Sequence, residues 1–373
     1  MALSADADYT MYLYTCNRCR SCAVEPSSER LSICPSYARM GFFAYSGGGK
    51  GYVAQGILEG KVKPTEETAK VAMECLSCGA CAQACPPGFD IMSFIRDLRH
   101  HLVERDIYAN DAHRELVERL RNTGSPWEGT KDRVGLPVYE GQDLLIWAGC
   151  RERAKPGVLN SVTAILDAAS VSYGVLDKET CCGSPFLDLG DKDGFEKQAE
   201  KTLGLLEKAS AERTLVLCPH CAAAMEVDYL EVGLPETELV NLPSFLAELV
   251  GEDKLELKEG EGAPVTYHDP CRLGRWIEDS DSAREVLSAM NVEVREMERR
   301  GEWTHCCGAG GVLAAVAPET SDYASRERAG EARRTGAEKV ITSCSYCVSR
   351  LNEEKGAPRT MHLADLVAKR LKS

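Results

Sequence analysis

Eighteen cysteines constrain this chain of 373 residues more than any other feature. They fall into four sets, and none is left over. Two four-cysteine sets lie near the N-terminus: Cys16, Cys19, Cys22 and Cys34, then Cys75, Cys78, Cys81 and Cys85. Two five-cysteine sets follow: Cys150, Cys181, Cys182, Cys218 and Cys221, then Cys271, Cys306, Cys307, Cys344 and Cys347. Such sets in an intracellular chain bind metals more often than they form disulfides. We therefore expect the protein to fold around metal centres.

The second four-cysteine set has the spacing of a bacterial ferredoxin. Its pattern is Cys75-x-x-Cys78-x-x-Cys81-x-x-x-Cys85-Pro86. In two-cluster ferredoxins the first three thiolates bind one cubane 4Fe–4S cluster and the fourth binds the other. The first set repeats the three-cysteine run and reaches Cys34-Pro35 after a longer gap of eleven residues. We therefore expect a first cubane site made of Cys16, Cys19, Cys22 and Cys85, and a second made of Cys34, Cys75, Cys78 and Cys81. Structural zinc, which also binds Cys-x-x-Cys pairs, is the alternative.

The predicted secondary structure changes after residue 142. Residues 1–126 show helical periodicity, over 91–102 and again over 112–122, and little strand signal. From residue 143 short apolar runs alternate with amphipathic helices, which is typical of parallel α/β sheets. We expect a multidomain protein with these parts: an α-helical dicluster ferredoxin domain at 1–126, a linker at 127–142, a Rossmann-like α/β domain at 143–250, a linker at 251–262 and a second α/β domain at 263–373.

The two α/β domains are an internal duplication. The apolar run LLIWAGC ends in Cys150, and VTYHDPC ends in Cys271, 121 residues later. TLVLCPHC and KVITSCSYC form a second matching pair, and the closing helices at 242–249 and 363–370 form a third. In parallel sheets ligands bind at the carboxyl ends of the strands. Cysteines that close predicted strands are therefore expected to hold a cofactor.

Each five-cysteine set has one thiol more than a cubane needs, because a cubane takes four. The set predicts either a cubane with an additional redox cysteine or a cluster that is not a cubane. Side chains of adjacent cysteines such as Cys181 and Cys182 would point to opposite faces of a strand. Both can face one cluster only if the chain turns, and Gly183 and Gly308 after the two Cys-Cys pairs permit such a turn.

These sets resemble the CCG domains of heterodisulfide reductase. Their patterns are Cys-x30-Cys-Cys-x35-Cys-x-x-Cys and Cys-x34-Cys-Cys-x36-Cys-x-x-Cys. A dicluster ferredoxin followed by two CCG domains is similar to the D-type subunit of that enzyme over nearly the whole chain. The resemblance implies noncubane 4Fe–4S clusters, a pair of which cleaves a disulfide held between them, and a role in anaerobic metabolism. Relatives include iron–sulfur subunits of lactate, glycolate and glycerol-3-phosphate dehydrogenases. Many of those lack part of a CCG set, whereas both sets are complete here.

Three histidines near the five-cysteine sets are candidate proton donors to a leaving thiolate. His305 precedes the second Cys-Cys pair, His268 lies in YHDPC and His220 lies in CPHC. Hydrogen bonding to cluster sulfur or to the backbone is the alternative role for each of them.

The segment from Ser46 to Gly51, SGGGKG, resembles a phosphate-binding loop. It lacks the first glycine at the required offset and a Ser or Thr after the lysine. We expect a flexible turn there. No GxGxxG motif opens a helix after a strand, so we expect no flavin or nicotinamide site in this chain.

Charge and composition narrow the possible partners and location of the protein. The net charge of −14 argues against a nucleic-acid partner. No apolar run approaches the ~20 residues of a membrane span, and the N-terminus lacks the basic and apolar segments of a secretion signal. We therefore expect a protein that is cytoplasmic, or attached to the cytoplasmic membrane through a partner.

The combined features predict an iron–sulfur oxidoreductase subunit. Electrons would pass two cubanes and reach the CCG sites, which would reduce a small disulfide or oxidise thiols. The expected partner is an electron-donor or acceptor subunit, either a flavoprotein or a membrane cytochrome. The alternative is a pure relay between a flavoprotein dehydrogenase and a quinone or membrane cytochrome, without disulfide chemistry. A zinc-stabilised scaffold is the third hypothesis.

Overall fold

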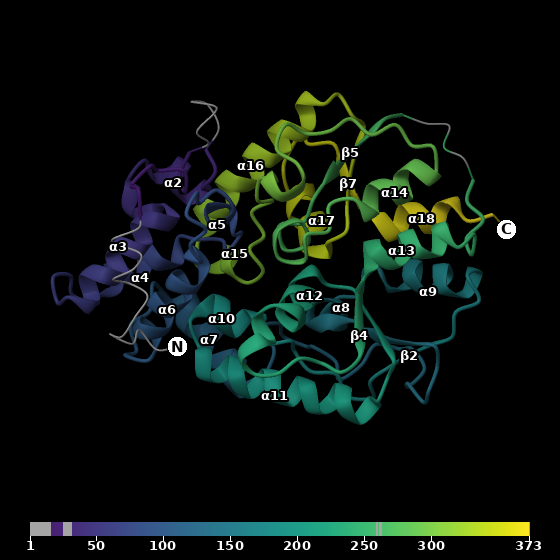
Figure 1. Ribbon diagram of the computed structural model, residues 1–373, viewed down its shortest axis with the longest axis horizontal. Coiled ribbons are helices and arrows are strands. Elements are labelled where there is room, and N and C mark those ends of the chain that lie inside the picture. Colours follow the sequence, from purple (N-terminus) through teal and green to yellow (C-terminus); the bar gives the residue numbers. More distant parts are fainter. Residues whose placement is uncertain (1–15, 25–31, 259, 261–262, 373) are drawn as a thin grey trace. The chain divides into compact units, whose positions relative to one another are not determined.

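The computed structural model describes residues 16–24, 32–258, 260 and 263–372 (Figure 1). The first fifteen residues of the predicted helical domain, and part of the predicted linker at 251–262, lie outside the described residues. The chain divides into two compact units. Unit 1 comprises residues 1–122, 185–195 and 305–326, and unit 2 comprises residues 123–184, 196–304 and 327–373. In the described part of the chain, no helix has the length and apolar character required to cross a membrane.

Unit 1 is helical, as the sequence predicts. Its elements are α2 (Pro35–Met40), η1 (Phe43–Tyr45), α3 (Gly47–Leu58), α4 (Glu66–Met73), α5 (Ala80–Gln83), α6 (Ile91–Val103), α7 (Asp111–Thr123), α10 (Ser184–Leu189) and α15 (Leu313–Val316). Helices α11 (Lys192–Ala209) and α16 (Pro318–Arg334) belong partly to each unit. The apolar stripe predicted over 91–102 is the buried face of α6, against which α3 and α4 pack.

The segment predicted to be a flexible turn is helical, so that prediction is wrong. Ser46 is the N-cap of α3, and its hydroxyl accepts a hydrogen bond from the N–H of Gly49 at 3.0 Å. A Cβ atom on Gly47 would lie 2.6 Å from the Cβ of Cys81, and one on Gly49 would lie 1.8 Å from the carbonyl oxygen of Phe43. The glycines are therefore required for close packing of the helix against its neighbours, not for flexibility.

Unit 2 contains two parallel sheets, which confirms the predicted α/β class. The first has the strand order β2-β1-β3-β4 and consists of β1 (Leu144–Trp147), β2 (Tyr173–Val175), β3 (Arg213–Val216) and β4 (Glu238–Asn241). The second has the order β5-β6-β7 and consists of β5 (Val265–His268), β6 (Lys339–Thr342) and β7 (Arg359–His362). All four residues of β1 and of β5 are buried, as expected for a sheet covered on both faces. The counterpart of β2 in the second repeat is a single parallel bridge between Val265 and Val294.

The remaining elements of unit 2 connect and cover these sheets. In the first repeat they are α8 (Gly149–Ala154), α9 (Leu159–Ala168), α12 (Pro219–Glu226), η2 (Asp228–Glu231) and α13 (Leu242–Gly251). In the second they are η3 (Leu273–Ile277), α14 (Ser282–Ala289), η4 (Gly301–Trp303), α17 (Ser345–Asn352) and α18 (Leu363–Arg370).

The two repeats pack against each other through equivalent helices. Helix α9 contacts α18, and α13 contacts α14 (Figure 1). Because α14 is the counterpart of α9 and α18 that of α13, the interface uses the same pair of surfaces twice. Ser161 bonds to Asp365 at 2.5 Å, and the positions 121 residues away, Ser282 and Ser244, lie 3.4 Å apart. One apolar core, which includes Val162, Leu246, Leu287 and Val367, runs through both repeats.

The packing of α3 predicts a difference between two glycine substitutions. Gly49→Ala should destabilise the protein by roughly 1–3 kcal/mol, because the new methyl group meets backbone atoms that cannot move aside. Gly204→Ala is the control, since Gly204 is an exposed residue in the interior of α11 with no atom within 4 Å of the added Cβ. It should stabilise by about 0.5–1 kcal/mol. Denaturant unfolding followed by circular dichroism measures both, and equal stability of the two variants would contradict the prediction.

Candidate metal centres

The four thiols of the predicted second cubane site line one cavity in unit 1. The cavity has an empty volume of about 340 Å³ including its opening to solvent, and its lining includes Cys34, Lys50, Cys75, Cys78 and Cys81. Burial raises the pKa of Cys34 to about 12, the Lys50 ammonium opposes this rise, and the charges of Cys75 and Cys78 add to it. The structure thus brings Cys34 to three cysteines that are distant in the sequence.

The cysteine loop of this site is fixed by a buried arginine. Arg99 of α6 is 1% exposed, and its guanidinium donates to the carbonyl oxygens of Cys75 at 2.7 Å and of Asp188 at 2.8 Å. It also donates to the hydroxyl of Ser77 at 2.9 Å. Ser77 and Gly79 both have positive φ, which shows how sharply the loop turns between its cysteines.

The thiols of the predicted first cubane site also lie close to one another. Burial raises the pKa of Cys85, and the nearby charges of Cys19 and Cys16 raise it further. Burial and the same two charges raise the pKa of Cys22, whose sulfur accepts a hydrogen bond from the N–H of Gly48 at 3.4 Å. The fourth cysteine of each sequence set therefore lies with the first three cysteines of the other set.

The first five-cysteine set forms one connected group of thiols in unit 2, beside the carboxyl ends of β1 and β3. Cys182 is in hydrogen-bond contact with Cys181 and with Cys221, and these two contacts lower its pKa to about 6 against the effect of burial. The thiol of Cys150 contacts that of Cys181, and this contact together with burial raises the pKa of Cys150. Cys218 contacts Cys221 and completes the group.

Buried polar side chains hold the backbone of this group. Gln198 and Thr202 donate to the carbonyl oxygen of Cys181 at 2.8 and 3.2 Å, and Tyr229 donates to that of Cys182 at 2.7 Å. The chain then turns at Gly183, where φ is +86°, so the predicted turn is present.

A second buried contact fixes the turn after β1. The carboxylate of Glu179 accepts the N–H groups of Ala148 and Gly149, both at 2.8 Å, and lies 3.1 Å from the guanidinium of Arg153. Burial raises the pKa of Glu179 to about 7, although Arg153 and the two amides favour the charged form. The turn that these contacts fix carries Cys150.

The second five-cysteine set is divided between the two units. Cys271, Cys344 and Cys347 belong to unit 2, whereas Cys306 and Cys307 belong to unit 1, as do Gly308 and His305. Within unit 1, the N–H of Gly308 donates to the sulfur of Cys306 at 3.3 Å, and φ of Gly308 is +91°. The turn predicted after the second Cys-Cys pair is therefore also present. His305 is buried.

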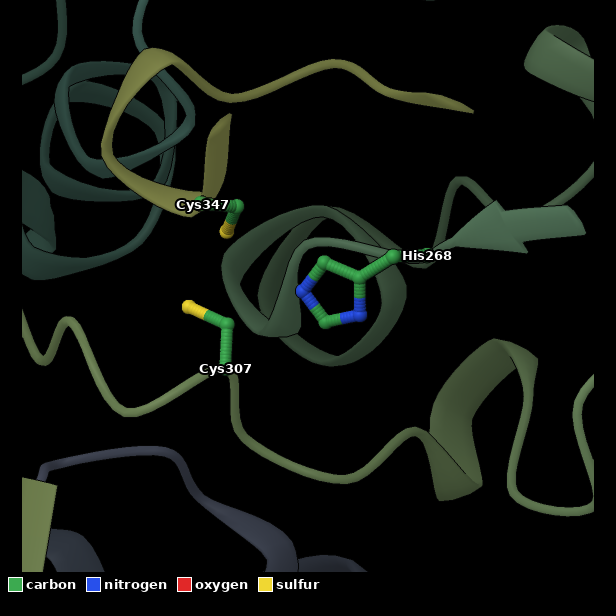
Figure 2. Close-up of side chains that lie close together, drawn as sticks. All are labelled: His268, Cys307 and Cys347. Carbon is green, nitrogen blue, oxygen red and sulfur yellow. The ribbon is translucent and has the colours of Figure 1, made fainter. Parts of the chain in front are cut away.

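His268 at the end of β5 is a further buried side chain that offers a ligand atom. Figure 2 shows it with Cys307 and Cys347, all three buried. Within unit 2, a ring nitrogen of His268 and the sulfur of Cys347 lie within 4.8 Å of each other. The Nδ1 atom of His268 accepts a hydrogen bond from Nε of Arg328 at 2.9 Å. When His268 is neutral, its proton is therefore on Nε2.

Residues of each repeat lie beside cysteines of the other within unit 2. Burial and the charges of Cys150 and Cys218 in the first repeat raise the pKa of Tyr346 in the second. The ring of Tyr346 lies 5.7 Å from that of His220 in the first repeat. Burial would lower the pKa of His220, but its hydrogen bond to Cys218 and the charge of Cys344 contribute to a rise to about 9. The two repeats therefore face each other with their cysteine-bearing edges.

Comparison with known proteins identifies the domains of the chain. Residues 12–89 match the family described as a 4Fe–4S dicluster domain, and residues 144–226 and 265–352 each match the cysteine-rich CCG domain. The D-type subunit of dihydromethanophenazine:CoB–CoM heterodisulfide reductase from Methanosarcina barkeri is 26% identical, over 93% of this chain and 90% of its own length. The chain therefore belongs to the family of iron–sulfur oxidoreductases that join a 4Fe–4S dicluster domain to two CCG domains.

Two further proteins are similar to this chain, one in sequence and one in fold alone. EtfAB:quinone oxidoreductase from Syntrophomonas wolfei is 28% identical over 74% of this chain, which spans 42% of that protein. A hypothetical protein from Helicobacter pylori has a solved structure that is similar in fold, with a TM-score of 0.63 at 11% identity over 87% of this chain and 68% of its own.

The donor atoms of the four sets fit iron–sulfur clusters. Each cubane site offers four thiols, and the charge on one thiol raises the pKa of its neighbours, so the sulfur atoms are close enough to interact. Residues 12–89 match a 4Fe–4S dicluster domain, and the CCG sets offer thiols of the same kind.

Several residues of these centres could not be recognised in the sequence. Glu179, Gln198, Tyr229, Arg99 and Arg328 act through backbone groups or a histidine ring, so no ligand spacing marks them. Only their burial in the folded chain distinguishes them from other charged and polar residues of helices and loops.

The geometry predicts which cysteines share a cubane. Cys34→Ala and Cys78→Ala should each remove the same cubane signal from low-temperature EPR spectra of the reduced protein, and the double variant should lose nothing more. Cys85→Ala should remove the other signal. Cys150→Ala, outside both cubane sites, is the control and should leave both signals. The crossed assignment is wrong if Cys34→Ala and Cys85→Ala remove the same signal.

Proposed function

We propose that this iron–sulfur oxidoreductase subunit receives electrons from a partner, passes them through two cubane clusters and reduces a disulfide at its paired CCG sites, or oxidises thiols in reverse. One observation carries the proposal. Within unit 2, Tyr346 of the second repeat lies beside Cys150 and Cys218 of the first, while His220 of the first lies near Cys344 of the second. A substrate between the repeats would be within reach of both.

The reaction is R–S–S–R′ + 2 e⁻ + 2 H⁺ → RSH + R′SH. The sulfur–sulfur bond breaks, both sulfur atoms are reduced and each leaves as a thiol. Iron–sulfur clusters supply the electrons one at a time. Two CCG sites that face one substrate would reconcile one-electron supply with a two-electron bond cleavage, which explains why both repeats keep five cysteines.

The chain's own residues would position the reacting groups and supply protons. His268, with its Nδ1 atom held by Arg328, presents an Nε2 proton in its neutral form. His305 is a second candidate donor. Trp127 donates to the Tyr346 hydroxyl at 3.0 Å and so orients that ring beside the cysteines of the first repeat.

The partner would be an electron-donor or acceptor subunit, either a flavoprotein or a membrane cytochrome. The similarity to the D-type subunit of a heterodisulfide reductase supports an assembly with other subunits. The protein would then act in the cytoplasm, or at the cytoplasmic membrane through that partner.

A pure electron relay is the second candidate function. Its support is the similarity to EtfAB:quinone oxidoreductase, whose name describes transfer to a quinone. In a relay the CCG sites would pass electrons onward and would cleave no disulfide.

Protein prepared without oxygen should contain about sixteen iron atoms per chain, with a similar amount of sulfide, if all four sites hold four-iron clusters. Exposure to air should bleach its colour. Iron and sulfide analysis with metal quantification measures this. Colourless protein that contains zinc in place of iron would support the zinc-stabilised scaffold instead.

Substitutions in the two CCG sets distinguish disulfide chemistry from a relay. If the two sets form one site, Cys182→Ser and Cys307→Ser should each abolish thiol oxidation with an artificial electron acceptor. The double variant should be no worse than either single variant, as expected for groups that act as a unit.

The control for this experiment is iron content, which shows whether each variant retains its other clusters. In a relay only the repeat on the electron path would matter. A fully active single variant that lacks its CCG cluster would therefore exclude a shared site.

A further inference from the structure

The first turn of α3 lies between the two cubane sites of unit 1. The N–H of Gly48 donates to the sulfur of Cys22, which belongs to the first cubane site, at 3.4 Å. A Cβ atom on Gly47 would lie 2.7 Å from the sulfur of Cys81, which belongs to the second. Burial raises the pKa of Cys81, and the charges of the second site and of Cys22 raise it further, so the two sites are electrostatically close.

Lys50, in the same turn, places a buried cation in the cavity of the second site. Its side chain is 1% exposed and lines the cavity that holds the four thiols of that site. Its ammonium donates to the hydroxyl of Ser36 at 3.3 Å and to the carbonyl oxygen of Tyr45. Both partners are neutral, and among the described residues no carboxylate pairs with Lys50. Burial of an uncompensated charge is costly, and an anionic thiolate cluster in the cavity would compensate it.

The two described cations that lie between the cysteines of the first cubane site in the sequence are exposed. Arg18 and Arg20 lie between its cysteines in sequence, and their guanidinium groups stack at 6.0 Å from the ring of Tyr52 and 5.9 Å from that of Tyr37. Solvent and salt screen such surface charges, whereas a buried charge acts through a lower dielectric. The electrostatic environments of the two sites therefore differ.

A positive charge close to a cluster favours its reduced form, because reduction adds one negative charge. Hydrogen bonds, net charge and exposure are among the factors that set cluster potentials. Arg99 is a second buried cation near Cys75, but its bonds also hold the loop. Lys50 bonds to no cysteine backbone, so its charge can be removed with less effect on the ligand loop.

We propose that Lys50 raises the reduction potential of the cubane at Cys34, Cys75, Cys78 and Cys81 above that of the other cubane, so that this cubane is reduced first. The inference rests on the proposed cubane ligands and deepens the proposed function by ordering the two steps. Lys50 is thus a tuning residue, and the segment that resembles a phosphate-binding loop has a role in electron transfer.

The test is a redox titration of the whole protein, monitored by EPR, which gives the midpoint potentials of both cubanes. Lys50→Gln should lower the higher of the two midpoints and leave the lower one in place. We expect about a tenfold loss of the reduced form at the wild-type midpoint, which corresponds to about 59 mV for one electron. Lys50→Arg keeps the charge and should stay near the wild-type value. Lys61→Met removes an exposed lysine just after α3 and should move neither midpoint.

Each outcome decides the proposal. A shift of the lower midpoint, no shift, or an equal shift in Lys50→Gln and Lys50→Arg would overturn the role of the charge. If Lys50→Gln and Lys50→Met both lose iron while Lys50→Arg keeps it, the charge is needed to bind the cluster rather than to set its potential, which overturns the proposal. Iron loss in all three would assign Lys50 to packing and overturn it. Wild-type protein without two cubane signals would instead overturn the cubane assignment on which the proposed function rests.

Discussion

Buried side chains that hydrogen-bond to the backbone beside a cysteine hold the sulfur atoms of this protein in place. Arg99 binds the carbonyl oxygen of Cys75, and Tyr229 binds that of Cys182. Glu179 accepts the two amides that precede Cys150. Cys75 and Cys182 lie outside helices and strands, where no regular hydrogen-bond pattern fixes the backbone, and Cys150 lies in the first turn of α8. Without these partners each thiol could occupy several positions, and outer contacts of this kind are what orient metal ligands in general.

Buried cations also lie near the candidate metal centres. The chain as a whole carries a net charge of −14, yet its most buried cations, including Lys50, Arg99, Arg272 and Arg328, lie beside cysteines or site histidines. Arg272 stacks at 4.4 Å from the ring of Trp276 and lies 4.0 Å from the carboxylate of Asp228. A buried cation is costly unless an anion accompanies it. The carboxylates of Asp228 and Glu331 provide that anion for Arg272 and Arg328. For Lys50 a thiolate cluster would provide it, so cluster binding and the stability of that site are expected to be coupled.

The sequence predicts the architecture well because hydrophobic periodicity and the 121-residue repeat are local or regular signals. Cysteines after apolar runs lie at the carboxyl ends of β1 and β3 and of β5 and β6, and both predicted glycine turns have positive φ. The prediction for Gly47–Gly49 is wrong because three glycines in succession disfavour a helix. Tertiary packing reverses that preference, since Cys81 and Phe43 leave no space for Cβ atoms there. Glu179, Arg99 and Lys50 are not predictable for the same reason: their partners come from distant segments, and no spacing rule joins them.

Duplication has preserved the scaffold of unit 2 more closely than its sites. The contact of α9 with α18 is equivalent to that of α14 with α13. Within these pairs, the contact of Ser161 with Asp365 is equivalent to that of Ser282 with Ser244. The ends of the equivalent strands differ. β5 ends in His268, whose ring is held by Arg328, whereas β1 ends in Trp147, a fully buried indole with no titratable group. A symmetric interface keeps two cysteine-bearing edges facing each other, while substitution at single positions makes the two edges chemically unequal. Unequal edges suit a reaction in which the two halves of one bond receive protons and electrons in different surroundings.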